Sequence, residues 1–106
     1  MESEHYRVRY TPLAYEDFDE IDTYISDVLL KPQAALSLLS EMEESINRLK
    51  QFPFIGSEVE DSYLASKGYR KLVVQHYLVF YLVDRASKEV VVMRVMYGAR
   101  EYRSLL

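Results

Sequence analysis

Three apolar runs follow one another between residues 69 and 97, in the sequence YRKLVVQHYLVFYLVDRASKEVVVMRVMY. Val, Leu, Tyr and Phe dominate each run, and these residue types favour β-strands. The polar residues between the last two runs are typical of a turn. We therefore expect three consecutive strands, Tyr69 to Gln75, Tyr77 to Val83 and Glu89 to Tyr97, which most simply form an antiparallel meander.

A shorter strand and two helices precede these runs. Residues 6–10 alternate apolar with cationic side chains, which is the period of a strand with one face in water. Thr11-Pro12 then predicts the start of a helix over about residues 12–30, because threonine is a good N-cap and proline fits the first helical position. Lys31-Pro32 ends this helix and opens a second one over about residues 32–51. Two helices of nearly equal length with so short a link are expected to form an antiparallel hairpin.

The predicted order is strand, helix, helix, strand, strand, strand. It is typical of an α+β fold (β-α-α-β-β-β) in which an antiparallel helix hairpin packs on one face of a small, mainly antiparallel sheet. On the first helix, spacings of three and four predict an apolar stripe made of Tyr15, Phe18, Ile21, Ile25, Val28 and Leu29. The helix dipole favours the acids near its start, and we expect the acids of this helix to form a solvated face that includes Glu16, Asp17, Asp19 and Glu20.

Size and composition narrow the class of protein. The 106 residues, 49% of them hydrophobic and 28% charged, fit one domain over residues 1–106. The absence of cysteine excludes a disulfide framework and a thiolate zinc site, and it favours the cytoplasm as the compartment. The two histidines, His5 and His76, lie far apart in the sequence, so we expect no metal site and no cofactor. The longest apolar run, residues 77–83, is too short to span a membrane, and no apolar leader is expected at the N-terminus.

The net charge of −4 hides an uneven distribution along the chain. Residues 1–66 hold 14 acidic and 5 basic side chains, whereas residues 67–106 hold 3 acidic and 8 basic ones. The basic C-terminal part is suited to contact phosphate or an acidic partner. Because the acidic part would repel nucleic acid, we exclude general coating of DNA and expect any contact with a polyanion to be one-sided.

The last two strands are apolar at odd and even positions alike. A sheet with one solvated face should alternate, so both faces are expected to need cover, and one helix hairpin covers only one of them. We expect a partner to cover the other face, with a second copy of the chain or its own tail and loops as alternatives. That face would hold the following residues or their sequence neighbours: Leu72, Val74, Leu78, Phe80, Leu82, Val92 and Met96.

Arg94 interrupts the last apolar run. By alternation it should share a face with Val92 and Met96, where a lone charge needs a counter-charge. Three interpretations stay open at this point: a salt bridge within the chain, a position at the sheet edge from which the side chain reaches water, and a contact with a target.

Four short motifs, in this order, resemble the RelE/ParE superfamily of bacterial toxins. They are Phe-Pro-x-x-Gly at residues 52–56, Tyr-Arg at 69–70, Tyr-x-x-x-Tyr at 77–81 and Tyr-Gly-x-Arg at 97–100. The resemblance spans nearly the whole chain. It implies a toxin neutralised by a cognate antitoxin, whose extended or helical segment packs on it, and a toxin that reaches operator DNA only through that antitoxin.

Members of the superfamily differ in target. The resemblance implies either cleavage of messenger RNA on the ribosome, as in RelE-like toxins, or inhibition of DNA gyrase, as in ParE-like toxins. For the metal-independent cleavage, it implies that Arg70 and Arg100 contact phosphate and that His76, Tyr97 and Tyr102 are candidates for proton transfer.

The resemblance also implies which residues contact the target and which contact the antitoxin. Contact with RNA or another target is expected of Lys71, Arg94 and Arg103, and contact with the antitoxin is expected of Leu72, Val74, Leu78 and Phe80. Leu78 stands where RelE-like enzymes carry an arginine, and losing such a clamp removes about 3 kcal/mol of transition-state stabilisation. The long, equal helices and the Phe-Pro-x-x-Gly exit are more similar to ParE. The target stays open between the ribosome and gyrase, and a non-toxic protein-binding module with the same fold is the alternative from another class.

Overall fold

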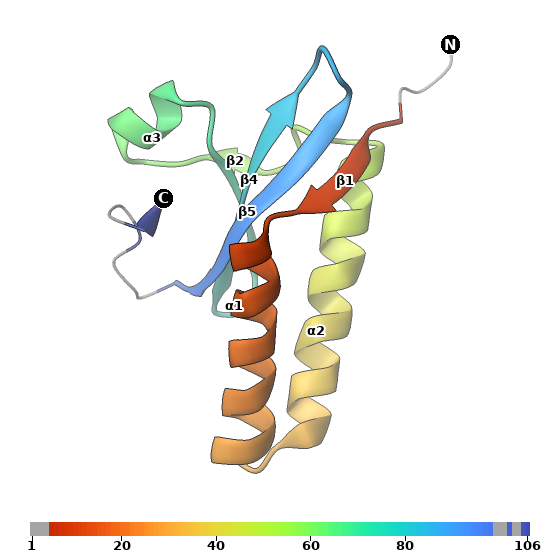
Figure 1. The fold of residues 1–106 in the computed structure, drawn as a ribbon, viewed down its shortest axis with the longest axis vertical. Coiled ribbons are helices and arrows are strands. Elements are labelled where there is room, and N and C mark those ends of the chain that lie inside the picture. Colours follow the sequence, from red (N-terminus) through yellow and green to blue (C-terminus); the bar gives the residue numbers. More distant parts are fainter. Residues whose placement is uncertain (1–4, 99–101, 103–104) are drawn as a thin grey trace.

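A helix hairpin packs against a five-stranded sheet in the computed structural model, which describes residues 5–98, 102, 105 and 106 (Figure 1). The elements run in the following order: β1 (Arg7–Tyr10), α1 (Pro12–Thr23), the π-turn η1 (Tyr24–Val28), α2 (Pro32–Asn47), the 3₁₀ turn η2 (Arg48–Lys50), β2 (Ser57–Glu58), α3 (Ser62–Ser66), β3 (Arg70–Val74), β4 (Tyr77–Asp84) and β5 (Glu89–Tyr97). The predicted α+β class, the hairpin and the four predicted strands are confirmed.

The strands lie in the order β1-β5-β4-β3-β2. β3, β4 and β5 form the expected antiparallel meander, whereas β1 pairs in parallel with β5. β2 adds two residues to the other edge, antiparallel to β3. The sheet is therefore mainly antiparallel, as predicted.

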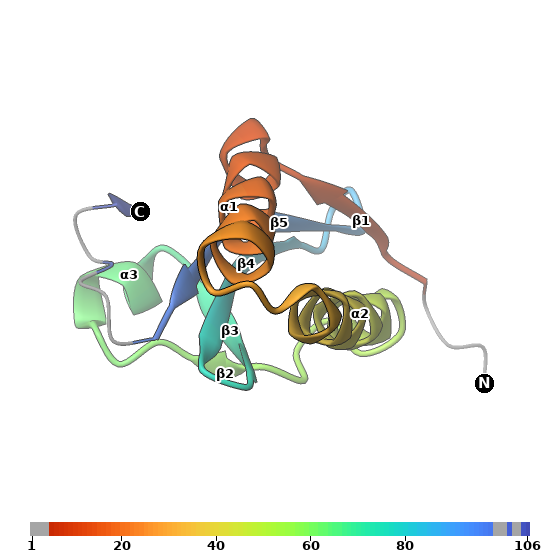
Figure 2. The same ribbon diagram turned by 90° about the horizontal axis from the view of Figure 1, so that it is seen from below.

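The hairpin begins and turns where the sequence predicts. The Thr11 hydroxyl accepts a hydrogen bond from the Ala14 N–H at 3.0 Å, and Pro12 takes the first position of α1. The predicted first helix ends in the π-turn η1, after which Leu30 adopts a positive φ of 55° and Pro32 opens α2. The two helices lie side by side in Figure 1 and in the view turned by 90° (Figure 2).

The predicted apolar stripe of the first helix is partly wrong. Tyr15, Val28 and Leu29 are exposed, at 59%, 65% and 45% of their surface, whereas Ala14 and Asp17 are buried together with Ile21 and Ile25. The buried positions 14, 17, 21 and 25 follow the helical period of 3.6. η1 widens the last turn, so residues beyond it leave this stripe.

Both faces of the sheet are covered by the chain itself. The hairpin closes one face over a core that includes Val79, Tyr81, Val90 and Val92. The opposite face holds a second cluster of Val59, Leu64, Tyr69 and Phe80, against which Tyr102 and Leu106 pack. Figure 2 shows α3 on the other side of the sheet from α2. The expectation that a partner must cover the second face is wrong for its centre, because residues 57–69 together with Tyr102 and Leu106 cover it.

A β-bulge changes which residues of β5 share a face. Phe80 pairs with Arg94 and Tyr81 with Val92, so Met93 has no partner of its own on β4. Arg94 therefore lies on the face of Phe80 and not on that of Val92, contrary to the alternation expected from the sequence.

Within the described residues, no helix has both the length and the apolar character needed to cross a lipid bilayer.

Candidate functional site

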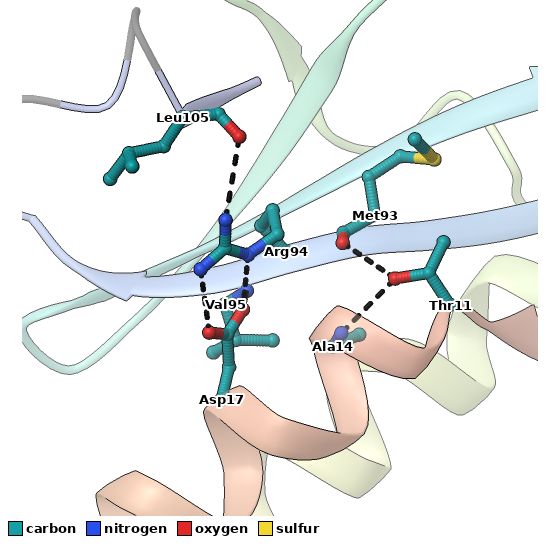
Figure 3. Close-up of polar contacts among 7 residues, drawn as sticks. All are labelled: Thr11, Ala14, Asp17, Met93, Arg94, Val95 and Leu105. Carbon is teal, nitrogen blue, oxygen red and sulfur yellow. Dashed lines mark hydrogen bonds and ion pairs between the residues drawn. The ribbon is translucent and has the colours of Figure 1, made fainter.

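Asp17 and Arg94 join α1 to the edge of β5 (Figure 3). The Arg94 guanidinium donates from Nε to Asp17 Oδ2 at 2.8 Å and from Nη2 to Oδ1 at 2.9 Å, and the Val95 N–H donates to Oδ2 at 2.9 Å. Only 6% of the Asp17 side chain and 14% of the Arg94 side chain are exposed. The hydrogen bonds to Asp17 raise the pKa of Arg94 above its ordinary value, against the opposing effect of burial.

The Asp17–Arg94 pair lies beside the part of β5 that has no strand partner on the side of β1. β1 ends at Tyr10, opposite Val92, while β5 continues to Tyr97. Beyond that point α1 supplies the edge contacts: the Thr11 hydroxyl donates to the Met93 carbonyl at 2.8 Å, and Asp17 accepts from Val95. Backbone groups of an edge that is buried need such partners.

Arg94 also contacts the C-terminal part of the chain, because its Nη1 donates to the Leu105 carbonyl at 3.4 Å (Figure 3). Of the three interpretations left open for Arg94, the salt bridge within the chain is the one observed. Sequence reasoning missed Asp17 as the counter-charge. The signal was its register, because Asp17 lies four residues before Ile21 and eight before Ile25, in line with the buried stripe.

Arg70 is held between the loop at residues 54–56 and β2. Its Nη2 donates to the carbonyls of Phe54 and Gly56, and its Nη1 lies 4.0 Å from a Glu58 carboxylate oxygen. The Phe54 ring lies under the guanidinium, at 5.4 Å from centroid to Cζ. Its Nε is buried and has no hydrogen-bond partner within the described residues. Arg70 therefore directs Nη2 to two carbonyls of its own chain.

Gly56 is required where the loop passes over the sheet. A Cβ at this position would lie 2.5 Å from the Lys71 carbonyl oxygen and 2.6 Å from the Tyr81 hydroxyl. The Gly56 N–H donates to that hydroxyl at 3.1 Å. Burial raises the pKa of the Tyr81 phenol, although the Gly56 N–H and Arg70 act in the opposite direction. The Phe-Pro-x-x-Gly and Tyr-x-x-x-Tyr motifs thus meet through one hydrogen bond.

His76 and Tyr97 lie at the opposite end of the sheet. The His76 carbonyl accepts a hydrogen bond from the Gly98 N–H at 2.7 Å, which places the β3–β4 turn beside the end of β5. Both residues line a groove of about 720 Å³ between the hairpin and this end of the sheet. Tyr24 and Tyr77 line it too, and the Tyr77 and Tyr97 rings meet edge to face at 5.7 Å. Burial, followed by the nearby phenols, raises the pKa of Tyr77.

The remaining candidates are dispersed. Tyr102 packs on Phe80 of the second face, with ring centroids 4.7 Å apart. Lys71 lies beside Phe80 on the neighbouring strand and is partly exposed. Arg100 and Arg103 lie outside the described residues.

The four residues predicted to bind the antitoxin do not share one face. Leu72 and Val74 lie on the face of the hairpin, whereas Leu78 and Phe80 lie on the other, as their pairing across β3 and β4 requires. Val74 and Phe80 are buried within the chain, at 3% and 0% exposure. Leu72 and Leu78 are partly exposed. Only these last two are accessible to a partner without rearrangement.

The geometry separates the candidate cation from the candidate proton donors. Arg70 begins β3, and His76 follows the end of the same strand, so the two lie at opposite ends of the sheet. Tyr97 is with His76, and Tyr102 is on the second face. Among the described residues, Arg70 therefore does not converge with His76, Tyr97 or Tyr102 on one reacting phosphate.

Comparison with protein families gives a match over residues 8–102 to the family described as the ParE toxin of the type II toxin-antitoxin system parDE. A comparison with curated proteins finds no match.

Solved structures with a similar fold include a toxin-antitoxin system, a toxin-antitoxin complex and a toxin. The chromosomal ParDE toxin-antitoxin system from P. aeruginosa matches with a TM-score of 0.72 and 23% identity, covering 88% of this chain and 96% of that one. The toxin-antitoxin complex RelBE2 from Mycobacterium tuberculosis matches with a TM-score of 0.61 and 23% identity, covering 88% and 98%. A YoeB/ParE toxin from Agrobacterium tumefaciens matches with a TM-score of 0.60 and 15% identity, covering 86% and 96%.

Proposed function

The chain belongs to the ParE toxin family of type II toxin-antitoxin systems, and from this premise we propose that it arrests growth by inhibiting DNA gyrase without catalysis. We propose further that a cognate antitoxin neutralises it by direct binding, that it acts in the cytoplasm, and that it reaches operator DNA only through the antitoxin. The similar structures include toxin-antitoxin complexes, which supports the antitoxin as a partner.

The observation that carries the choice of gyrase is the engagement of two arginines. A nuclease of the RelE type needs cationic donors directed at the charge that develops on the phosphate. Arg70 donates instead to the carbonyls of Phe54 and Gly56, and Arg94 donates to Asp17. Redirecting Arg94 would leave the buried Asp17 carboxylate without its counter-charge, and redirecting Arg70 would remove a donor from the carbonyl of Gly56, a buried residue; both changes are costly.

Two further features support a mechanism without catalysis. Leu78 stands where the related nucleases carry an arginine, so a third clamp is missing. His76 and Tyr97 line the groove at the far end of β3 from Arg70. Proton transfer requires donor and acceptor within hydrogen-bond reach of the same reacting group, and this spacing does not favour it.

Controlled expression in a bacterium tests the proposal. We expect growth to stop, plasmid supercoiling to relax or the DNA to be cleaved, and transcript 5′ ends on ribosomes to stay unchanged. Cuts spaced by codons with normal supercoiling would instead establish mRNA cleavage. Unchanged growth would support a non-toxic binding module. Co-expression of the product of the adjoining reading frame, as the candidate antitoxin, should restore growth.

A further inference from the structure

The tip of the helix hairpin, residues 28–30, is apolar and exposed. Val28, Leu29 and Leu30 expose 65%, 45% and 78% of their surface. Figure 1 shows the tip at the far end of the hairpin, beyond the end of the sheet. Three consecutive apolar residues in water contribute little to a core, and exposed apolar patches of this kind mark contacts with other molecules.

Leu30 has a backbone conformation that favours glycine. Its φ is 55°, and the Lys31 N–H closes the turn by donating to the Ile25 carbonyl at 2.9 Å. At the end of a helix this left-handed position is usually taken by glycine or asparagine, because other side chains are strained there. Leu30 combines this strain with an exposed side chain, so the fold does not account for a leucine at this position.

A shallow pocket adjoins the tip. Glu20, Tyr24 and Val28 are spaced by four, so they form one stripe along the helix. The pocket on this stripe has a volume of about 330 Å³ and is lined by Asp19, Glu20, Thr23, Tyr24 and Val28. An aromatic ring, an apolar wall and two carboxylates suit a lysine or arginine side chain, because its stem is apolar and its end is cationic.

The charge of the hairpin favours a cationic partner. Residues 12–47 hold nine acidic side chains and one basic side chain. Near the tip, Asp19, Asp22 and Asp27 are exposed, and none of them forms an ion pair within the described part of the chain. Carboxylates around an apolar tip repel a polyanion and attract a surface rich in lysine and arginine.

DNA gyrase must have a surface of this chemistry, because an enzyme that holds DNA meets the phosphates with lysine and arginine. We propose that the hairpin tip docks on gyrase, with Leu30 in an apolar recess and a lysine or arginine of the cationic surface in the acidic pocket. This inference rests on the proposed function, which supplies gyrase as the target. An apolar centre within a charged rim is the usual anatomy of a specific interface.

Replacing Leu30 tests the docking without damaging the fold. Leu30→Gly removes the apolar side chain and relieves the unfavourable φ, so its Tm should be unchanged or higher. Its Kd for purified gyrase, measured by titration calorimetry, should nevertheless rise by about tenfold or more. Leu30→Asn keeps a side chain that tolerates this conformation but makes it polar, and it should weaken binding in the same way.

Lys88→Gly is the matched control. Lys88 has a φ of 54°, is exposed and lies in the turn between β4 and β5, at the opposite end of the molecule from the tip (Figure 1). This variant makes the same change of backbone freedom away from the docking site. Its Kd for gyrase should equal that of the unsubstituted chain.

Salt dependence tests the cationic nature of the partner surface. The Kd for gyrase should rise with salt concentration, because ions screen the attraction. Replacing the pocket carboxylates together, by Asp19→Asn with Glu20→Gln, should weaken binding and flatten this dependence. Glu43→Gln with Glu44→Gln removes two exposed charges from α2 of the same hairpin and should preserve it. Equal salt dependence in the two double variants would contradict the role of the pocket.

The outcomes separate this inference from the proposed function. If Leu30→Gly binds and inhibits gyrase like the unsubstituted chain, only the docking site is wrong. If Leu30→Gly binds gyrase more weakly but even the unsubstituted chain does not inhibit it, the docking site stands and the proposed function is wrong. Absence of any binding to gyrase would overturn both. Loss of antitoxin binding in Leu30→Gly, with gyrase binding unchanged, would assign the tip to the antitoxin and overturn the inference.

Discussion

The Asp17 carboxylate and the Arg94 guanidinium, 77 positions apart in the sequence, meet through two hydrogen bonds of 2.8 and 2.9 Å (Figure 3). Asp17 also accepts the Val95 N–H, so one carboxylate serves both a guanidinium and the edge of a strand. The pair fixes α1 on the part of β5 that β1 does not reach. The pair also occupies the guanidinium of Arg94, which the sequence alone predicts as a candidate contact with a target.

Asp17→Asn should lower the free energy of unfolding by about 3 kcal/mol, because it leaves the buried Arg94 charge without its partner. Glu16→Gln is the control, since Glu16 is the exposed neighbour on the same turn of α1 and should change stability little. Urea unfolding of both variants gives the comparison. Equal effects of the two substitutions would contradict the role assigned to Asp17.

Gly56→Ala should destabilise the protein by about 1–3 kcal/mol, because the added methyl group would meet a backbone carbonyl and the buried Tyr81 ring. Ser57→Ala, at the exposed neighbouring position, is the control. Both are measured by thermal unfolding. A Gly56→Ala variant as stable as the control would show that the loop over the sheet can shift.

The phenol of Tyr81 should ionise only at a pH above that of an ordinary tyrosine, because burial raises its pKa. An unfolded tyrosine has a pKa of about 10, so the neutral phenol stabilises the fold below that pH. This contribution is lost as the pH rises through the higher pKa of the folded state. An ultraviolet titration should lose one late-ionising phenol in Tyr81→Phe, and a titration curve identical to that of the unsubstituted chain would be evidence against the burial effect.

Arg70→Ala should cost about 1–3 kcal/mol of stability, because the carbonyls of Phe54 and Gly56 lose their donor. The folded fraction should still inhibit gyrase at the concentration that the unsubstituted chain requires. Inhibition is compared at equal concentrations of folded protein. Complete loss of inhibition by a variant that is still folded would place Arg70 in the functional site.

Arg100→Ala should abolish toxicity and leave antitoxin binding largely intact. This prediction follows from the Tyr-Gly-x-Arg motif, since Arg100 lies outside the described residues. Growth after induction and the Kd for the antitoxin are measured in parallel. A fully toxic variant would remove Arg100 from the site.

Long elements with a strong composition or period could be predicted from the sequence, and short ones could not. β3, β4 and β5 lie within one residue of the predicted bounds, because long apolar runs between turn residues indicate strands. β2 and α3 have two and five residues, too few for a period to show. They are nevertheless the elements that help to cover the second face.

The candidate site was harder to predict, because it depends on contacts between distant segments. The bulge at Met93 leaves no trace in a run that is apolar at odd and even positions alike, so the sequence predicts the wrong face for Arg94. The carbonyls that engage Arg70 belong to a loop with no periodicity. The burial of Asp17 could have been predicted, because this acid is in helical register with Ile21 and Ile25 and so lies within the apolar stripe.

The most direct test of the account is an assay with purified gyrase and relaxed plasmid, run beside translating ribosomes loaded with a defined messenger RNA. The account predicts that the chain blocks the introduction of supercoils and that prior addition of the antitoxin restores it, while the messenger stays whole. Cleavage of the messenger by the same preparation, with gyrase unaffected, would contradict it.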